Sequence, residues 1–438
     1  MISRKPTARA AALGAAAATF LLAACGGSSS GGATPAASSG GAASSAPSTE
    51  KVTLKVNFWG DFGLDDLAKQ YEAAHPNVHI QLNPGDYAAQ HDALQKAIVA
   101  GSGAPDISAV DEGFIVKFRS QADKFNNLLD LGAGSYEPKY LPWKWKQSLS
   151  ADGKTQIGLG TDVGGLAMCY RSDLFAKAGL PTERDKVSAL WPTWDKFQDV
   201  AKQYTAKTGA KFIDAASNIM NPVLGQQSVG YVDTNEQLQM DGGPKAAWDI
   251  ATKFITDGTS ANLVSFTPAW DAAFKSGKFA VLACPAWMGG YIKGKAPETS
   301  GKWDIAAIPG GGGNWGGSFW TIPKQSKHAK EAYDFITWAV DPAQQLAIFK
   351  KVGNLPSQPD MYKDPALVDF ANPFFSNAPV GKIYTDSASK LQPQYLGKKS
   401  GDIRTAVEAV LTKVQQGKET PEQGWTDAKA EAEKAAKG

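Results

Sequence analysis

From residue 52 onward, strand-like and helix-like segments alternate along the chain. Residues 52–59 read VTLKVNFW, an alternating β-rich run, and a helical pattern follows until Pro76 stops it. A second strand is predicted at 78–82, a helix at 88–100 and a third strand at 106–111. Strand, helix and strand at this spacing are typical of βαβ units. We therefore predict that the folded part opens as an α/β sheet.

The length and composition predict a soluble protein of more than one domain. A chain of 438 residues is too long for one ordinary core. The net charge is +2, and basic and acidic residues are interspersed, which argues against a nucleic-acid partner. The 13 Trp, 12 Tyr and 19 Phe exceed what such cores need. This surplus suits either carbohydrate stacking or protein interfaces.

The N-terminal residues predict export and a lipid anchor. Residues 1–24 have a basic start and an Ala/Leu run that is short for a bilayer, which indicates a secretory signal peptide rather than a spanning helix. The run ends in LAAC at Cys25, which resembles a bacterial lipobox, whose cysteine is diacylated and becomes the mature N-terminus. The alternative is a secreted protein with a chance cysteine. Residues 25–50 comprise this Cys25 and a flexible Gly/Ser/Ala tether, so we expect attachment to the extracytoplasmic face of the cell membrane.

Residues 276–292, SGKFAVLACPAWMGGYI, place a tryptophan after a buried strand. The short apolar run between Gly and Pro predicts a strand covered on both faces, which Pro285 ends. In open α/β sheets, ligands bind outside the carboxyl ends of the strands, where Trp287 can offer a stacking face. The alternative is that Trp287 belongs to the core.

Other candidate binding residues follow the three predicted strands of the first sheet. They are Trp59, Asp61, Tyr87, Asp111 and Glu112. Because each lies at a carboxyl strand end, we expect these side chains to face one cleft. For Asp61, Tyr87 and Glu112 the alternative is a solvated loop position.

Several ordered motifs resemble the sugar-binding group of extracellular solute-binding proteins of ABC importers, the maltose-binding-protein-like family 1. The family's pattern "F-x-x-G-x" followed by "A-M-x-I-x-G-P-W" is matched here from Phe274 to Trp287, although Cys284 replaces the usual Gly or Asn. The strand opening with Phe58-Trp59, the segment 158–170 and the GNLPS segment from 353 also match. The resemblance covers nearly all of residues 51–438.

This resemblance implies an α/β, two-lobed periplasmic-binding-protein-like fold with a hinge of about three crossings. The N-terminal lobe is expected at 51–163 and 309–352. The C-terminal lobe is expected at 164–308 and 353–438. The two lobes would close around a ligand.

The resemblance also assigns roles to residues near the crossings. It implies that Trp287 stacks on a sugar ring. Asp162, just before the first crossing, is expected either to bind sugar hydroxyls or to cap the glycines after it. Trp315 would stack from the rim of the glycine-rich return crossing or pack against it, and Asn354 would offer an amide. Trp270 is a further cleft candidate, with a core position as the alternative.

The function implied is that of the substrate-binding component of an ABC transporter. The chain would capture an oligosaccharide, with a β-linked gluco- or xylo-oligosaccharide such as cellobiose as our specific guess, and deliver it to the transmembrane subunits of a permease. We expect a monomer without a cofactor. The alternatives are a secreted, lipid-anchored carbohydrate-cleaving enzyme and the same fold binding a non-sugar solute.

The sequence offers no enzyme motif, and it leaves two cysteines after lipidation. None of the four histidines has a metal-site or triad spacing, and no G-x-S-x-G elbow is present, so we expect neither a metal site nor an enzyme. Two carboxylates suffice for a glycosidase, so missing motifs do not exclude one. Cys169 and Cys284 lie in strands near the expected hinge of an exported chain. We predict a disulfide between them, with two buried free thiols as the alternative.

Overall fold

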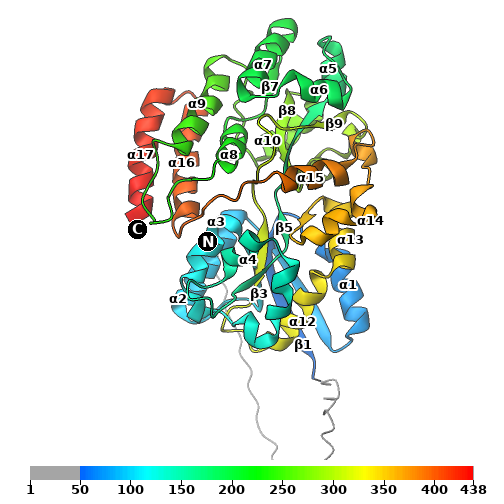
Figure 1. Ribbon diagram of the computed structural model, residues 1–438, viewed down its shortest axis with the longest axis vertical. Coiled ribbons are helices and arrows are strands. Elements are labelled where there is room, and N and C mark those ends of the chain that lie inside the picture. Colours follow the sequence, from blue (N-terminus) through cyan, green and yellow to red (C-terminus); the bar gives the residue numbers. More distant parts are fainter. Residues whose placement is uncertain (1–49, 438) are drawn as a thin grey trace, which may run out of the picture. The chain divides into compact units, whose positions relative to one another are not determined.

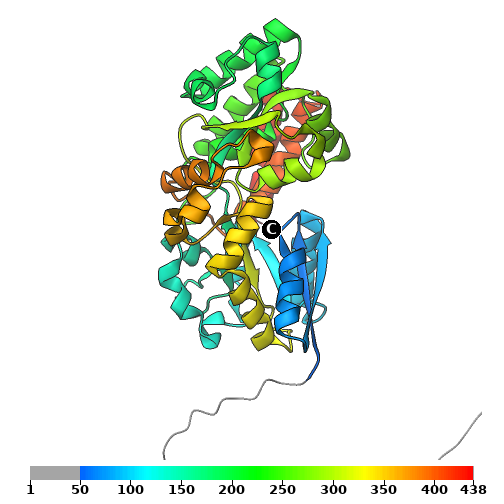
Figure 2. The same ribbon diagram turned by 90° about the vertical axis from the view of Figure 1, so that its right-hand side faces the viewer.

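The computed structural model of the protein describes residues 50–437. Figure 1 shows two lobes stacked along the long axis, and Figure 2 shows the same division after a quarter turn. Each lobe has its own β-sheet, so the two-lobed α/β fold expected from the sequence is confirmed. The predicted signal peptide and Cys25 lie outside the described residues, and the exact lobe boundaries stay a prediction.

The first lobe is built on a five-stranded sheet with the order β2-β1-β3-β10-β4. Its strands are β1 (Val52–Trp59), β2 (Val78–Gly85), β3 (Ile107–Asp111), β4 (Gly158–Gly160) and β10 (Ser318–Thr321). β1 pairs in parallel with β2 and β3, as βαβ units require, whereas β10 lies antiparallel between β3 and β4. The chain therefore returns to this lobe after building the second one.

Local sequence signals position the helices of the first lobe. These helices are α1 (Leu64–Ala74), α2 (Tyr87–Ala100), α3 (Glu112–Arg119), α4 (Pro142–Ser148), α12 (Ala329–Ala339) and α13 (Pro342–Val352). The carboxylate of Asp86 accepts a hydrogen bond from the N–H of Ala89 and caps α2, which ends at Gly101 in the left-handed conformation. Asp111 caps α3 in the same way, so the end of β3 and the start of α3 hold its carboxylate in place.

The second lobe is built on a four-stranded sheet with the order β7-β8-β6-β9. Its strands are β6 (Leu166–Arg171), β7 (Lys211–Ile213), β8 (Phe279–Pro285) and β9 (Trp303–Ala306). β6 runs antiparallel to both of its neighbours, and β7 is parallel to β8. Every residue of β8 is buried, in agreement with the predicted strand covered on both faces, and Pro285 is its last residue.

Eleven α-helices cover the second sheet and its approach from the hinge. They are α5 (Ser172–Lys177), α6 (Arg184–Leu190), α7 (Trp194–Thr208), α8 (Ser217–Gly225), α9 (Gly243–Thr256), α10 (Pro268–Ser276), α11 (Met288–Lys295), α14 (Pro365–Val368), α15 (Val380–Ser389), α16 (Ser400–Gln415) and α17 (Pro421–Lys437). Six short 3-10 helices are distributed over the chain from 50 to 437, at 122–124, 128–131 and 133–139 between α3 and α4, and at 297–299, 359–363 and 373–375. The apolar side of α16 joins the core of the second lobe through Ile403, Val407 and Leu411. The N-terminal turn of α16 therefore belongs to the second lobe while it reaches the first (Figure 1).

Three chain segments connect the lobes and are hydrogen-bonded to one another. In the first and third, β5 (Asp162–Val163) pairs antiparallel with β11 (Leu355–Pro356). In the second, the N–H of Trp315 donates to the carbonyl oxygen of Gly164 over 3.0 Å. A Cβ on Gly164 would lie 1.8 Å from the carbonyl oxygen of Trp315, so this close approach requires glycine.

A disulfide joins the two central strands of the second sheet. Cys169 on β6 and Cys284 on β8 have Cα atoms 5.4 Å apart and are bonded through their sulfur atoms. Cys169 lies opposite Leu282, two residues from Cys284, so both side chains project from the same face of the sheet. This is the pairing expected from the sequence rather than two free thiols.

Candidate functional site

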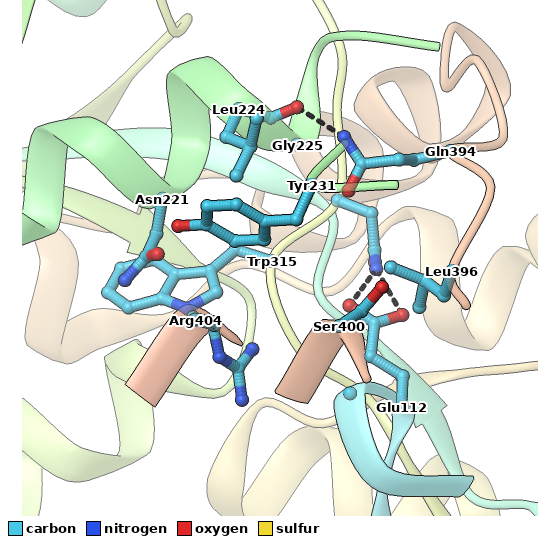
Figure 3. A pocket seen from close by; sticks show the side chains of 12 residues that line it. Glu112, Asn221, Leu224, Gly225, Tyr231, Trp315, Gln394, Leu396, Ser400 and Arg404 are labelled. Carbon is cyan, nitrogen blue, oxygen red and sulfur yellow. Dashed lines mark hydrogen bonds between the residues drawn. The ribbon is translucent and has the colours of Figure 1, made fainter. Parts of the chain in front are cut away.

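A small cavity lies where the two lobes meet the second crossing (Figure 3). Its volume is about 50 Å³. The cavity is lined by Glu112, Gly113, Asn221, Leu224, Gly225, Tyr231, Asn314, Trp315, Gln394, Leu396, Ser400 and Arg404. The first two residues come from the start of α3 in the first lobe, and Asn314 and Trp315 come from the crossing. The remaining residues belong to the second lobe, so relative movement of the lobes changes the size of the cavity.

Glu112 connects the first lobe to the second crossing. Its two carboxylate oxygens accept hydrogen bonds from the side-chain amide of Asn314, each over 2.7 Å, and one also accepts from the N–H of Gly316. Burial raises the pKa of Glu112 to about 7, although the nearby Lys144 ammonium acts in the opposite direction. This carboxyl group therefore changes its protonation near neutral pH at the wall of the cavity.

Asp111 is the centre of a charged network between the lobes. The hydroxyl of Tyr87 donates to the Oδ1 of Asp111 over 2.9 Å, and the guanidinium of Arg404 donates to the same oxygen over 3.1 Å. Arg404 also donates to the hydroxyl oxygen of Tyr87. Burial alone would raise the pKa of Asp111, but Arg404 and His91 together with the hydrogen bonds lower it below its ordinary value. Asp111 is therefore held as a carboxylate.

A buried lysine lies behind these carboxylates at the hinge. The Nζ of Lys144 has no hydrogen-bond partner among residues 50–437 and lies 4.0 Å from the ring centroid of Phe319. Burial lowers its pKa, while Glu112 and Asp162 act to raise it. Asp162 accepts a hydrogen bond from the N–H of Ser318 over 3.0 Å, and burial raises the pKa of its carboxyl group. Asp162 therefore holds the crossing against β10 and does not line the cavity.

Two tryptophans, which the sequence analysis named separately, meet at the rim of the second lobe. The indole N–H of Trp287 donates to the carbonyl oxygen of Trp315 over 3.1 Å, and their ring centroids are 5.6 Å apart at an angle of 73°. Both side chains are half-buried, and Trp315 lines the cavity. Gly316 adopts a φ of +90°, and a Cβ there would lie 3.0 Å from the indole nitrogen of Trp287. The glycine-rich crossing thus allows the indole of Trp287 to approach the backbone.

The structure separates the remaining predicted residues. Trp59 is half-buried and its ring contacts Tyr87 and His91, which places it beside the Asp111 network. Asp61 is exposed and accepts a hydrogen bond from the N–H of Gly63, which is the loop alternative. Asn354 is 7% exposed, in the third crossing.

Trp270 is a correction to the sequence analysis. Its side chain is fully buried in the core of the second lobe, so it does not face the cleft in this structure. The physical reason is its indole N–H, which donates to the buried carboxylate of Asp214 over 2.7 Å. The ring of Trp270 also packs against the rings of Phe274 and Tyr291. The core alternative therefore holds.

Sequence reasoning missed six polar residues that line the cavity. They are Asn221, Tyr231, Asn314, Gln394, Ser400 and Arg404. The hydroxyl of Tyr231 is buried and has no hydrogen-bond partner within the described part of the chain, so it is available to a ligand. These residues lie in helices or loops far apart in the sequence and share no motif. The one sequence signal for Arg404 is its place near the start of an amphipathic helix.

Two properties of residues 50–437 bear on membrane and metal sites. No helix in this range is long and apolar enough to cross a membrane. No group of three or more His, Cys, Asp or Glu side chains in this range is arranged to hold a metal ion. The site thus combines aromatic faces, a few carboxylates and an arginine. Such a set can pack against apolar faces of a solute and bind its hydroxyl groups.

The chain is similar to known solute-binding proteins. The arabinooligosaccharide-binding protein of Bacillus subtilis (strain 168) is 23% identical over 369 residues, covering 78% of this chain and 83% of the relative. The lactose-binding protein of Rhizobium radiobacter is 25% identical over 304 residues, covering 66% of this chain and 69% of the relative. A crystal structure of an extracellular solute-binding protein of family 1 is 38% identical, with a TM-score of 0.76, and covers 88% of this chain and 100% of the other.

A family model described as bacterial extracellular solute-binding protein matches residues 66–373. The matched range includes β3, the second crossing and Trp287, which form much of the site. It spans well over half of the chain. The protein therefore belongs to the family of bacterial extracellular solute-binding proteins.

Proposed function

We propose that this protein captures an oligosaccharide between its lobes and delivers it to the transmembrane subunits of an ABC permease. The observation that carries the proposal is the meeting of Trp287 and Trp315 beside a cavity walled by Glu112 and Arg404. Sugar rings have apolar C–H faces that stack on aromatic rings and hydroxyl groups that bind to charged side chains. The names of the relatives from Bacillus subtilis and Rhizobium radiobacter, which bind arabinooligosaccharide and lactose, support the same ligand class.

Capture requires the lobes to open. A cavity of about 50 Å³ holds a few water molecules, whereas pockets for larger organic ligands are roughly 300–1,000 Å³. The cavity as described is therefore too small to admit a disaccharide. A sugar that contacts both lobes favours a closed form by differential binding, and that form would dock on the permease.

Three finer points complete the proposal. A β-linked gluco- or xylo-oligosaccharide such as cellobiose remains our specific guess for the ligand. Diacylation of Cys25 would anchor the protein at the outer face of the cell membrane, and residues 26–50 would serve as its tether. We expect the protein to act as a monomer, because one chain supplies both walls of the site.

The deciding experiment is a thermal-shift and tryptophan-fluorescence titration of the purified protein. The panel should hold arabino-, gluco- and xylo-oligosaccharides and lactose, with chromatography of every sugar that binds. We expect saturable stabilisation by at least one oligosaccharide that is recovered intact. Cleaved sugar would instead identify a carbohydrate-cleaving enzyme. If no sugar of the panel binds and a non-sugar solute does, the protein is a solute-binding protein for a different class of ligand.

A further inference from the structure

Phe266 is a large apolar residue that the structure leaves exposed. Its side chain is 53% exposed, and its backbone has a φ of +62°. Residues other than glycine rarely adopt this left-handed conformation, because the Cβ approaches the backbone. An exposed aromatic ring held in a costly backbone conformation is a feature that stability alone does not explain.

The topology places Phe266 at the edge of the second sheet that faces the hinge. Pro285, the last residue of β8, pairs with Leu166, where β6 begins directly after the first crossing. β7 is parallel to β8, so its carboxyl end lies at the same edge. The N–H of Leu263 donates to the carbonyl oxygen of Asp214, just after β7, over 3.1 Å. The loop that carries Phe266 is therefore attached to the edge that presents Trp287.

Phe266 extends the aromatic surface that begins at the cavity. Its ring centroid lies 6.2 Å from that of Trp287, and the two planes differ by only 31°. Trp287 in turn contacts Trp315, which lines the cavity. The three rings thus form a continuous row from the cavity to the solvent-exposed rim. A linear sugar chain bound at the cavity would meet these rings one after another.

The ring of Phe266 packs against two other aromatic rings, which restrict its rotation. Tyr291 contacts it at 5.6 Å with perpendicular planes, and Trp270 contacts it at 5.0 Å. The hydroxyl of Tyr291 donates to Asp271 over 2.7 Å, which fixes its ring. An aromatic face already restricted by packing loses little conformational entropy when a ligand stacks on it. This is how a binding surface differs from a hydrophobic residue exposed by chance.

We propose that Phe266 forms an outer sugar-stacking subsite beyond Trp287, so that the site recognises oligosaccharides longer than the inner tryptophans alone can hold. The inference rests on the proposed function, because it names the chain length of the same ligand class. The ligand at this subsite is a pyranose or furanose ring with an exposed C–H face. Stacking of such a ring adds affinity only when the sugar reaches Phe266.

The test is calorimetric titration of the wild-type protein and Phe266→Ala with arabino-oligosaccharides and cello-oligosaccharides of two to five residues. For the series that binds, we expect wild-type affinity to rise about tenfold once the chain reaches the outer subsite. Phe266→Ala should lose that gain and keep the disaccharide affinity within about twofold. Phe266→Tyr should restore the dependence on length. Val99→Ala, a change at a 72% exposed valine of α2, is the matched control and should behave as wild type.

The outcomes separate this inference from the proposed function. Equal weakening of all chain lengths by Phe266→Ala, or no dependence on length in the wild type, would overturn the outer subsite and leave oligosaccharide capture standing. Unchanged sugar affinities together with impaired uptake would assign Phe266 to contact with the permease and also overturn it. Binding of no sugar from these two series, from xylo-oligosaccharides or from lactose would overturn both. Phe266→Asn, which tolerates a positive φ, should unfold no more easily than wild type and still lose the gain with length.

Discussion

The guanidinium of Arg404 lies 3.1 Å from the carboxylate of Asp111, and this pair joins α16 of the second lobe to β3 of the first. Both side chains are largely buried, at 18% and 9% exposure. Helices α16 and α3 are in direct contact beside this pair. A Cβ on Gly401 of α16 would lie 2.5 Å from the carbonyl oxygen of Gly113 in α3. The closed arrangement of the lobes therefore has a polar contact of its own, in addition to any that a ligand provides.

Arg404→Gln should shift the protein toward an open form. Removing one partner of a buried ion pair commonly costs about 3–5 kcal/mol when the other charge stays buried. Here the lobes can separate and let water reach Asp111, so we expect opening before unfolding. Small-angle scattering of the unliganded variant should give a larger radius of gyration than the wild type.

The matched control for that variant is Lys117→Gln. Lys117 and Asp402 also join α3 to α16 over 3.0 Å, but their side chains are 27% and 26% exposed. This pair is more exposed to water than Arg404 and Asp111, which weakens the attraction between its charges, so Lys117→Gln should alter the scattering less than Arg404→Gln. Equal radii for wild type and Arg404→Gln would show that the buried pair does not hold the lobes together.

Glu112 should make stability depend on pH between about 4.5 and 7. Its pKa is near 7 in the folded protein and near 4.5 when unfolded, so the folded state binds more protons in this window. The free energy of unfolding contributed by this group is therefore fully present below pH 4.5 and falls as the pH rises through 7, by at most roughly 1.4 kcal/mol per pH unit. Above pH 7 its contribution should be constant.

The measurement is the difference in denaturant midpoint between the wild type and Glu112→Gln across this range. Glutamine keeps an oxygen for Asn314 and does not titrate, so the variant should lose the part of the slope that Glu112 supplies. Burial also raises the pKa of Asp214 to about 6, but its effect is common to both proteins and cancels in the difference. Parallel pH profiles would contradict the assignment to Glu112.

Alanine variants of Trp287 and Trp270 should affect different properties, sugar affinity in the first case and stability in the second. Trp287→Ala removes a half-buried ring at the rim, so we expect oligosaccharide affinity to fall about 10- to 100-fold with a small change in melting temperature. Trp270→Ala removes a fully buried ring and the hydrogen bond to Asp214, which should cost about 3–5 kcal/mol of stability. Parallel thermal melts and sugar titrations check both. A Trp270→Ala protein of normal stability that fails to bind sugar would return Trp270 to the site.

The disulfide between Cys169 and Cys284 should contribute measurably to stability. It closes a segment of 115 residues, for which the chain-entropy account predicts up to about 5 kcal/mol. Reductant should therefore lower the urea midpoint of the wild type. The double variant Cys169→Ala/Cys284→Ala should have this lower urea midpoint even without reductant, and reductant should not change it. Two titratable thiols in unreduced mature protein would show that the bond does not form.

Much of the fold was visible in the sequence because its signals are local. Alternating apolar residues predicted β1, and the run from Phe279 to Cys284 predicted β8. Asp111 and Glu112 were found because each follows a short buried strand, and the topology of a parallel sheet brings such positions to one edge. The family resemblance indicated the crossing around Trp315, and the glycines there fit a bending loop, because glycine adopts positive φ values readily.

The sequence by itself thus determined the alternation of elements, the strand ends that carry Trp59 and Trp287, and the two cysteines near the hinge. Only the tertiary structure decided that Trp270 turns into the core and that Arg404 reaches Asp111 in the other lobe. It also decided that Phe266 continues the aromatic row. The physical reason is range. Strand and helix patterns arise from contacts within a few residues, whereas these partners are brought together by sheet pairing and lobe packing.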